Sequence, residues 1–166
     1  LIKAYANLPQ SLRNIHSLTI IGDGPLREKL ESLAKNLHVN VIFKGGLSRD
    51  NVLTAVSKAR VFCFPSIRAK SGDAEGMGIA IMESMALGVP IVMFDGQPMS
   101  KYIKRYSAGL LAEYESTDDL AVKLAAILED DGLALDCVSN GQILCEKEFD
   151  LAKNVEKLEL LYESIK

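Results

Sequence analysis

Short apolar runs alternate along this chain with longer segments in which apolar residues recur every three or four positions. The apolar runs fall at residues 18–21, 41–43, 61–64 and 90–94, with a weaker run at 110–112. Runs of this length are typical of buried β-strands, whereas the recurring spacing between them and after residue 117 is helical. Strands that are apolar throughout and alternate with helices indicate a parallel sheet covered on both faces. The pattern predicts a doubly wound, Rossmann-like α/β domain.

The segments that follow the strands are the candidate binding loops. In open parallel sheets the ligand crevice lies beyond the carboxyl ends of the strands. That edge comprises residues 22–25, 44–47, 65–78 and 95–100. The third segment is long, and long loops in compact domains are commonly functional. Pro25 is expected at the first position of the next helix, and Ser48 at the N-cap of the helix after that.

Composition limits the domain number and the class of partner. A chain of 166 residues that is 48% hydrophobic and 25% charged suits one compact domain, here residues 1–166. Its 19 basic and 22 acidic residues give a net charge of −3, and the basic residues are scattered. Nucleic-acid binding needs a concentrated positive surface. No nucleic-acid partner is expected.

The cysteines, histidines and termini point to a cytoplasmic protein without a metal. The three cysteines are odd in number, and Cys63 lies within an apolar run, so a reducing compartment fits best. No apolar run approaches the ~20 residues that span a bilayer, and no secretion signal begins the chain. His16 and His38 have no metal-binding spacing with the cysteines. We therefore expect a cytoplasmic location and neither a metal nor a cofactor.

Glu83 lies in the middle of a strongly apolar segment, residues 74–90, with the sequence AEGMGIAIMESMALGVP. A helix is expected from about Met77 to Leu87. The positions three and four residues from Glu83 hold only Ile79, Ala80, Ala86 and Leu87. A carboxylate buried without hydrogen bonds costs several kcal/mol. We therefore expect Glu83 to take donors from elsewhere in the fold or from a ligand, for which the hydroxyls of a sugar would serve.

Glu75 stands just ahead of this helix, between small residues that allow close approach. The backbone N–H groups of Gly76, Met77 and Gly78 would be unpaired donors of the first turn, and with the helix dipole they would form an anion site that suits a phosphate. A simpler interpretation is that Glu75 complements the dipole, Glu83 points to solvent beside its neighbouring serine, and the glycines serve a turn. The spacing alone leaves both interpretations open.

These residues carry a family resemblance. The arrangement E-G-M-G-(x4)-E-S-M-A-(x)-G-V-P from Glu75 to Pro90 resembles the signature E-G-F-G-(x4)-E-A-M-A-(x)-G-x-P of glycosyltransferase family 4, the group 1 glycosyltransferases. Residues 64–66 (FPS), residues 21–26 (IGDGPL) and the pair Leu161–Tyr162 are also similar to that family's pattern. Several ordered motifs at the right separations make the resemblance specific, and it covers nearly the whole chain.

The resemblance implies the C-terminal, nucleotide-sugar-binding half of a two-domain, B-type glycosyltransferase fold. Its first strand and the N-terminal acceptor domain are absent from the chain. The implied reaction is retaining, metal-independent transfer of a hexose from a nucleoside-diphosphate sugar to an acceptor hydroxyl, in glycan or exopolysaccharide synthesis. The acceptor, a glycan or a lipid-linked sugar, would be bound through the missing domain, as would any membrane. The isolated chain is expected to be inactive.

The resemblance also implies roles for particular residues. Glu75 would be the catalytic carboxylate against the donor hexose, and Glu83 would accept hydrogen bonds from the ribose hydroxyls. The other residues expected at the donor site are Gly76, Met77 and Gly78 at the diphosphate or sugar, Gly45, Gly46 and Leu47 at the nucleobase, and Gly22 in the upstream motif. Arg68 and Lys70 are candidate cations for the diphosphate. An ordinary strand-to-helix turn at residues 45–47 fits the sequence equally well. Most loop cations are only solvated, and this simpler interpretation is favoured for Arg68 and Lys70.

Two other functions fit parts of the pattern. A domain that binds nucleotide-sugars without catalysis would need the same residues, and a sugar-nucleotide epimerase shares the B-type fold. The epimerase needs an acid–base pair, which we cannot assign in this sequence. A glycosidase would require two carboxylates facing each other across a glycosidic bond. Glu75 and Glu83 are instead expected to contact different parts of one ligand.

Overall fold

The computed structural model describes residues 1–68 and 77–165, and within them a parallel sheet in two parts. One part pairs β1 (Leu18–Ile20) with β2 (Val41–Phe43), in a register that sets Leu18 opposite Val41. The other part has the order β3-β4-β5, formed by Phe62–Phe64, Ile91–Phe94 and Gly109–Ala112. All of these pairings are parallel. The predicted parallel α/β fold is confirmed.

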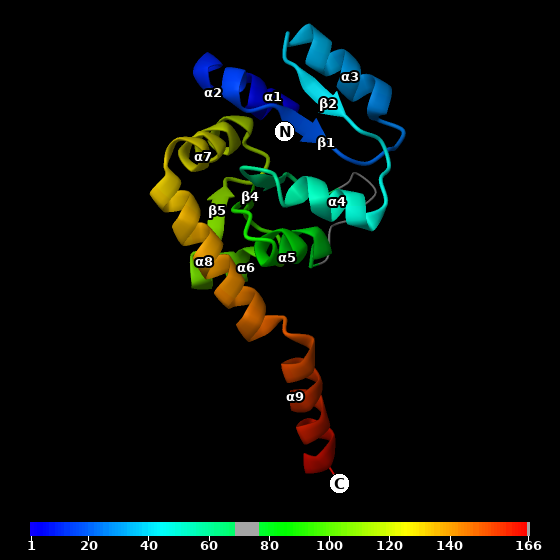
Figure 1. The fold of residues 1–166 in the computed structure, drawn as a ribbon, viewed down its shortest axis with the longest axis vertical. Helices are drawn as coiled ribbons and strands as arrows, with labels where there is room; N and C mark the ends of the chain where they lie inside the picture. The colour runs from blue at the N-terminus through cyan, green and yellow to red at the C-terminus, as the bar shows by residue number, and fades with distance from the viewer. Residues whose placement is uncertain (69–76, 166) are drawn as a thin grey trace.

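Helices connect the strands and extend the chain (Figure 1). The first four are α1 (Ile2–Ala6), α2 (Gln10–Ile15), α3 (Arg27–Asn36) and α4 (Arg49–Val56). They are followed by α5 (Ile79–Ala86), α6 (Ser100–Tyr106), α7 (Thr117–Glu129), α8 (Asp131–Glu148) and α9 (Leu151–Ser164). Within the described residues, no helix combines the length and the apolar character needed to cross a bilayer.

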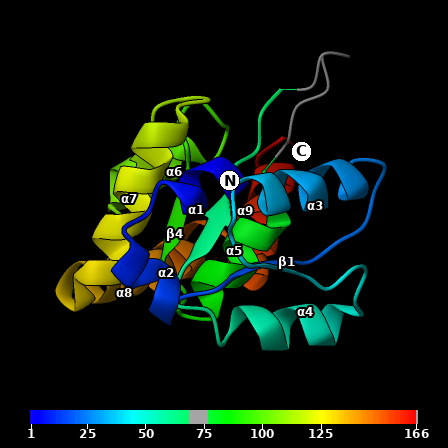
Figure 2. The ribbon, with the colours of Figure 1, turned by 90° about the horizontal axis from the view of Figure 1, so that it is seen from above.

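β4 is buried on both faces, as a central parallel strand should be. Val92 and Phe94 pack into a core with α1 and α7, which lie side by side in Figures 1 and 2. Ile91 and Met93 face the opposite way and pack into a second core with α5, α6 and α8. Because successive strand residues point to opposite faces, this alternation places helices on both sides of the sheet. The doubly wound layering is thereby confirmed.

The predicted boundaries hold to within one or two residues, with one correction. The weak run at 110–112 is a real strand, and Gly88 follows the end of α5 with a φ of 74°, as a glycine beyond a helix end often does. Pro25, however, is not the first helical residue. The N–H of Arg27 donates to the carbonyl of Gly24 at 3.1 Å, so Pro25 occupies the second position of a turn that precedes α3. Its fixed φ suits that position equally well.

The sheet is divided between β1 and β3. No ladder joins these two strands in the described residues, so each has one edge without a strand partner. The β1–β2 pair continues past the strand ends through a bridge in which the N–H of Gly22 donates to the carbonyl of Gly45 at 2.8 Å. The carboxyl ends of β1 and β2 are thus held together at the edge where the candidate loops lie.

Candidate functional site

Glu83 lies on the side of α5 that faces α4, and its side chain is 26% exposed. The helix turns its buried face inward through Ile81, Ser84 and Met85. The hydroxyl of Ser84 donates to the carbonyl of Ala80 at 2.7 Å, so the residue beside Glu83 is satisfied within the helix. Glu83 is therefore neither deeply buried nor freely solvated.

Arg49 provides the cation that the local sequence around Glu83 lacks. Its Nη2 and Nε both donate to Oε1 of Glu83, at 2.7 Å and 3.1 Å. Arg49 is the first residue of α4, directly after the loop that follows β2, and lies 34 residues before Glu83. Glu83 was expected to take hydrogen-bond donors either from elsewhere in the fold or from a ligand. The two donors observed belong to the fold itself. In this pairing the Glu83 carboxylate lies against Arg49 and keeps 26% of its side chain exposed to solvent.

Sequence reasoning did not identify Arg49 as part of the site. The available signal was its position, since it is a basic residue immediately after a candidate loop at the carboxyl end of a strand. Both nitrogens bind the same carboxylate oxygen, and no hydrogen bond to Oε2 of Glu83 is formed within the described residues. That oxygen remains able to accept hydrogen bonds from a ligand.

Gly78 sets the start of α5. It is the N-cap residue, with a left-handed φ of 64°, and a Cβ there would lie 2.9 Å from Cδ1 of Ile81. Both observations favour glycine at this position. The next residue upstream, Met77, is 38% exposed. Gly76, Glu75 and Lys70 lie outside the described residues, so their predicted contacts remain predictions.

The structure brings Gly22 and Gly45, both expected at the donor site, into direct backbone contact. Gly45 has a φ of 67°, and Gly46 and Leu47 beside it are exposed. Arg27, the first residue of α3, stacks over the ring of Phe43 at the end of β2, with its guanidinium carbon 5.9 Å from the ring centroid. This cation–π contact joins the start of α3 to the end of β2. The exposed backbone N–H and C=O groups of Gly46 and Leu47 can form hydrogen bonds with the edge of a planar ring.

The segment after β3 is held to the neighbouring loops. The backbone N–H of Arg68 donates to the hydroxyl of Tyr114 at 2.7 Å. The side-chain amide of Gln97, in the loop after β4, donates to the carbonyl of Ser66 at 3.0 Å. These bonds place the backbone of Arg68 at the same edge of the sheet as the other candidate loops.

Asp95 is the residue directly after β4, at the same edge of the sheet. The ammonium of Lys104 donates to its Oδ2 at 2.7 Å and the N–H of Gly96 to its Oδ1 at 2.7 Å. The Lys104 hydrogen bond, followed by that of Gly96, holds the pKa of Asp95 below its ordinary value. Within the described residues, no group of three or more histidine, cysteine, aspartate or glutamate side chains is arranged to hold a metal.

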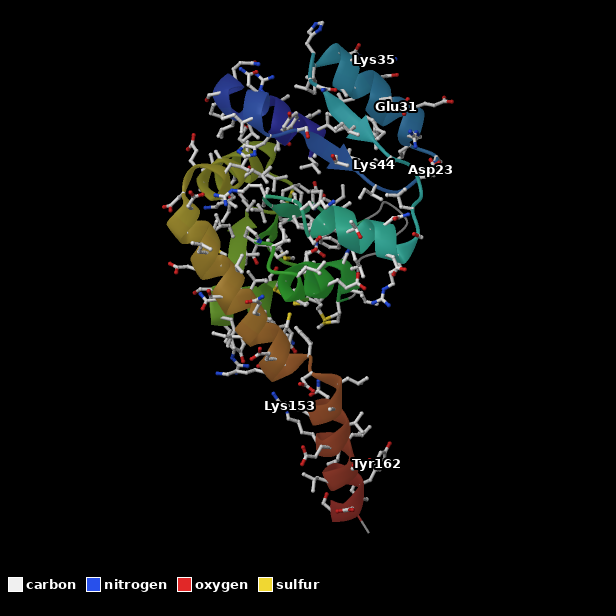
Figure 3. All side chains as sticks on the ribbon, viewed as in Figure 1. Asp23, Glu31, Lys35, Lys44, Lys153 and Tyr162 are labelled. Atoms are coloured by element: carbon white, nitrogen blue, oxygen red, sulfur yellow. The ribbon has the colours of Figure 1, made fainter. Side chains whose placement is uncertain are left out.

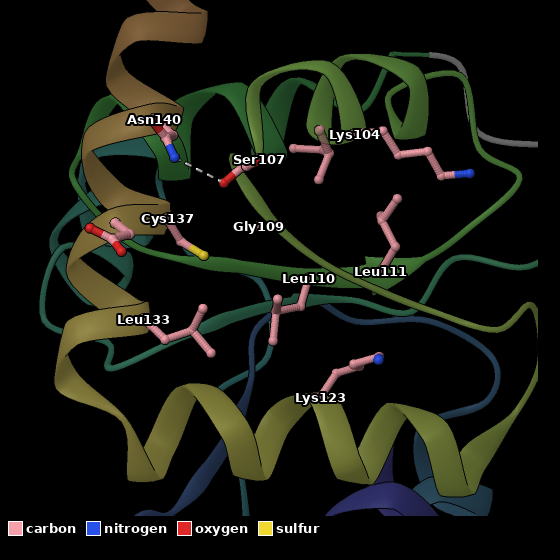
Figure 4. Close-up of a pocket in the computed structure, with 11 residues that line it drawn as sticks. Lys104, Ser107, Gly109, Leu110, Leu111, Lys123, Leu133, Cys137 and Asn140 are labelled. Carbon is pink, nitrogen blue, oxygen red and sulfur yellow. Dashed lines mark hydrogen bonds between the residues drawn. The ribbon is translucent and has the colours of Figure 1, made fainter.

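A pocket of about 480 Å³ lies elsewhere, beside β5 and between α6, α7 and α8 (Figure 4). Its walls include Lys104, Lys123 and Leu133, and the side-chain amide of Asn140 donates to the carbonyl of Ser107 across it. Among the described residues, none of those expected at the donor site lines this pocket. The candidate site is therefore the loop edge around Glu83, Arg49, Gly22 and Gly45.

The family model for "Glycosyl transferases group 1" matches residues 1–143. The chain belongs to this family. The family predicted from the segment at 74–90 is thus confirmed.

Curated relatives share this assignment over part of their length. The chain is 32% identical over 128 residues to a GDP-mannose-dependent alpha-(1-6)-phosphatidylinositol monomannoside mannosyltransferase of Mycobacterium tuberculosis, covering 74% of the chain and 33% of the relative. It is 31% identical over 152 residues to an N-acetyl-D-galactosaminyltransferase of Campylobacter jejuni that acts on an undecaprenol-linked glycan, covering 91% of the chain and 40% of the relative. The chain therefore spans about a third to two fifths of these relatives' length.

Solved glycosyltransferase structures share the fold. WaaG, a glycosyltransferase involved in lipopolysaccharide biosynthesis, matches with a TM-score of 0.74 and 26% identity, over 89% of this chain and 38% of its own. Anabaena Alr3699/HepE, solved in complex with UDP, matches with a TM-score of 0.83 and 20% identity, over 99% of this chain and 44% of its own. Both matches support the Rossmann-like fold, and both leave more than half of the other chain unmatched.

Proposed function

We propose that residues 1–166 form the donor-binding half of a retaining, metal-independent hexosyltransferase. The reaction moves a hexose from a nucleoside-diphosphate sugar to an acceptor hydroxyl in the synthesis of a glycan or exopolysaccharide. Family membership and the names of the relatives, one of which uses GDP-mannose, support this proposal. So do the neighbouring structures that contain UDP or UDP-glucose.

The observation that carries the proposal is the position of Glu83. Its half-buried carboxylate is held by Arg49 through one oxygen, which leaves the other oxygen for ribose hydroxyls. Hydrogen bonds to a charged acceptor contribute about 1.5–3 kcal/mol each, roughly twice a neutral bond. Glu83 therefore serves as the anchor of the nucleoside, and the exposed backbone of residues 45–47 contacts the base.

The remaining roles follow the family motif. The N–H groups of Gly76, Met77 and Gly78 bind the diphosphate or sugar oxygens, with help from Arg68 and Lys70. Donors of this kind stabilise the charge that develops on the leaving diphosphate without a metal. Glu75 lies against the hexose, whose ring carbon gains positive charge in the transition state of glycosyl transfer.

A second domain and one further strand would complete the enzyme. The open edges of β1 and β3 support this part of the proposal, because an added parallel strand between them would join the two parts of the sheet. We assign the acceptor glycan or lipid-linked sugar, and any contact with a membrane, to that second domain. The isolated chain then binds donor in the cytoplasm but transfers no sugar.

Calorimetry with UDP-glucose and GDP-mannose tests the donor site. Glu83→Gln removes the charge and should weaken binding by about tenfold or more, as the loss of one charge-assisted hydrogen bond predicts. Glu148→Gln is the matched control, because Glu148 is also 26% exposed and also pairs with an arginine, Arg105. Equal affinities of the wild type and Glu83→Gln would refute the ribose role. Sugar transfer by the pure chain would refute its inactivity.

A further inference from the structure

Two residues from other loops hold the segment that follows β3. The side-chain amide of Gln97 donates to the carbonyl of Ser66 at 3.0 Å, and the N–H of Arg68 donates to the hydroxyl of Tyr114 at 2.7 Å. Gln97 follows β4 and Tyr114 follows β5, so residues 66–68 run across the ends of both strands. Both bonds use backbone groups of the segment, and they therefore do not depend on its side chains.

The backbone of Gln97 is fixed at the start of α6. Its N–H donates to Oγ of Ser100 at 3.1 Å, and the N–H of Ser100 donates back to the carbonyl of Gln97 at 2.9 Å. Ser100 is only 4% exposed. The amide that binds the carbonyl of Ser66 thus extends from a rigid part of the fold, which is how a supporting residue keeps its partner in place.

Tyr114 is fixed by packing at the ends of β4 and β5. Its ring meets the ring of Phe94 edge to face, with the centroids 6.2 Å apart, and Phe94 is 5% exposed. The N–H of Asp95 donates to the carbonyl of Ala112 at 2.7 Å and joins the ends of the two strands. Tyr114 itself is 41% exposed. Its ring therefore rests on the core while its hydroxyl binds the segment after β3.

The held segment leads along the chain to the start of α5. Phe64 is the last residue of β3, and a Cβ added to Gly78 would lie 3.4 Å from Cζ of Phe64. Residues 66–68 and Gly78, which stand on either side of residues 69–76, are therefore both fixed to the sheet. In the proposed function, the N–H groups of Met77 and Gly78 bind the diphosphate or the sugar, and Arg68 assists them.

We propose that Tyr114 and Gln97 are positioning residues for the diphosphate and the sugar of the donor. They act through the segment after β3, which they hold at the sheet edge before any ligand binds. A loop that is already ordered loses less conformational entropy on binding, so holding it raises the affinity. This inference rests on the proposed function, because it needs the diphosphate and the sugar to lie against this segment.

The nucleoside part of the proposed site lies on other elements. The loops after β1 and β2 are joined by the bond between Gly22 and Gly45, and Figure 3 shows Asp23 and Lys44 in these loops. Glu83, the proposed ribose anchor, is on α5 and is held by Arg49 of α4. Loss of the Tyr114 or Gln97 bond should therefore weaken the binding of the diphosphate and sugar without changing that of the nucleoside.

Calorimetry separates the two parts of the donor. The probes are UDP-glucose and GDP-mannose, each compared with UMP or GMP, which lack the second phosphate and the sugar. Tyr114→Phe removes only the hydroxyl and should weaken sugar-nucleotide binding by about two- to tenfold, the equivalent of one neutral hydrogen bond, while the affinity for UMP or GMP stays unchanged. Gln97→Leu should have the same effect. Tyr106→Phe is the matched control, because that hydroxyl donates to Glu148 on α8, and it should change neither affinity.

Hydrogen exchange at the Arg68 amide tests the bond itself. In Tyr114→Phe this N–H loses its acceptor, so we expect it to exchange at least about threefold faster than in the wild type. In Tyr106→Phe its rate should stay the same. An unchanged rate in Tyr114→Phe would overturn the inference, because the hydroxyl would then not be holding the segment.

The binding data distinguish failure of the inference from failure of the proposed function. Sugar-nucleotide binding that Glu83→Gln weakens, but that Tyr114→Phe and Gln97→Leu leave unchanged, overturns the inference alone. An equal loss of affinity for UMP or GMP in Tyr114→Phe also refutes it, since that result indicates a general loss of structure. A wild-type protein that binds neither sugar nucleotide refutes the proposed function, and the inference with it.

Discussion

Arg49→Ala removes the cation that pairs with Glu83 and so measures how strongly α4 is tied to α5. Two unit charges 2.7 Å apart attract by about 1.5 kcal/mol even in the dielectric of bulk water. The Arg49 side chain is 77% exposed, so the cost of ordering it and the screening by solvent reduce that gain. We expect a coupling free energy of about 0.5–1 kcal/mol between Arg49 and Glu83.

The assay is a double-mutant cycle on the free energy of unfolding in urea, with Arg49→Ala, Glu83→Gln and the double variant. The coupling should shrink at 1 M salt, where the Debye length is only about 3 Å. A second cycle on Arg105 and Glu148 is the control. Its charged atoms are 3.3 Å apart, and the hydroxyl of Tyr106 also donates to Glu148, so a smaller coupling is expected.

The same variant links stability to ligand binding. If Arg49 holds Glu83 ready for a nucleoside, Arg49→Ala should weaken the binding of UDP or GDP by about two- to fivefold, the equivalent of the expected coupling. A coupling near zero that does not depend on salt would refute the pairing. Tighter nucleotide binding by Arg49→Ala would refute the positioning role, because it would mean that arginine competes with the ligand.

Further outcomes follow from other parts of the structure. Gly78→Ala should lower the free energy of unfolding by about 1–3 kcal/mol, because φ is 64° and the new Cβ would crowd a buried isoleucine. Gly46→Ala is the control in a urea titration. A Cβ at residue 46 meets open space within the described residues, so this change should cost less. The pKa of Asp95 is lowered in the folded state, so the ionised carboxylate stabilises the folded protein above the ordinary carboxyl pKa, and this stabilisation is lost as the pH falls through the folded-state pKa. Lys104→Met should therefore lower the free energy of unfolding at pH 7. The difference between this variant and the wild type should vanish at strongly acidic pH. The Cys63 side chain is half-buried, and desolvation raises the pKa of its thiol to about 12, so a thiol reagent at pH 8 should modify it much more slowly in the native protein than in denaturant; equal rates in the two states would contradict the raised pKa.

The strands were predictable because burial on both faces is recorded directly in the sequence. A strand covered by helices on each side must be apolar at every position, and residues 91–94 satisfy this without any knowledge of their partners. The glycine after α5 was predictable for a related reason, since helices often end with a left-handed residue just past the last turn, and glycine adopts that conformation most easily. Pro25 was misplaced because its fixed φ suits a turn and a first helical position equally.

The candidate site was only partly predictable. The contact between Gly22 and Gly45 follows from the rule that the carboxyl ends of neighbouring parallel strands meet at one edge. The partner of Glu83 did not follow from any local pattern, because Arg49 belongs to a different strand–helix unit. Helical spacing reports only neighbours three and four residues away.

The sequence by itself determined the class of fold, the order of its elements, the family and the segments that form the loop edge. All of these depend on local periodicity or on motifs within one segment, where burial and backbone conformation restrict the residue types. Only the tertiary structure decided that Arg49 meets Glu83, that β1 and β3 are not paired with each other in the part of the chain that it describes, and that α9 buries none of its residues there. These features depend on how separate elements pack in space, and the packing energy of such contacts leaves no periodic signal along the chain.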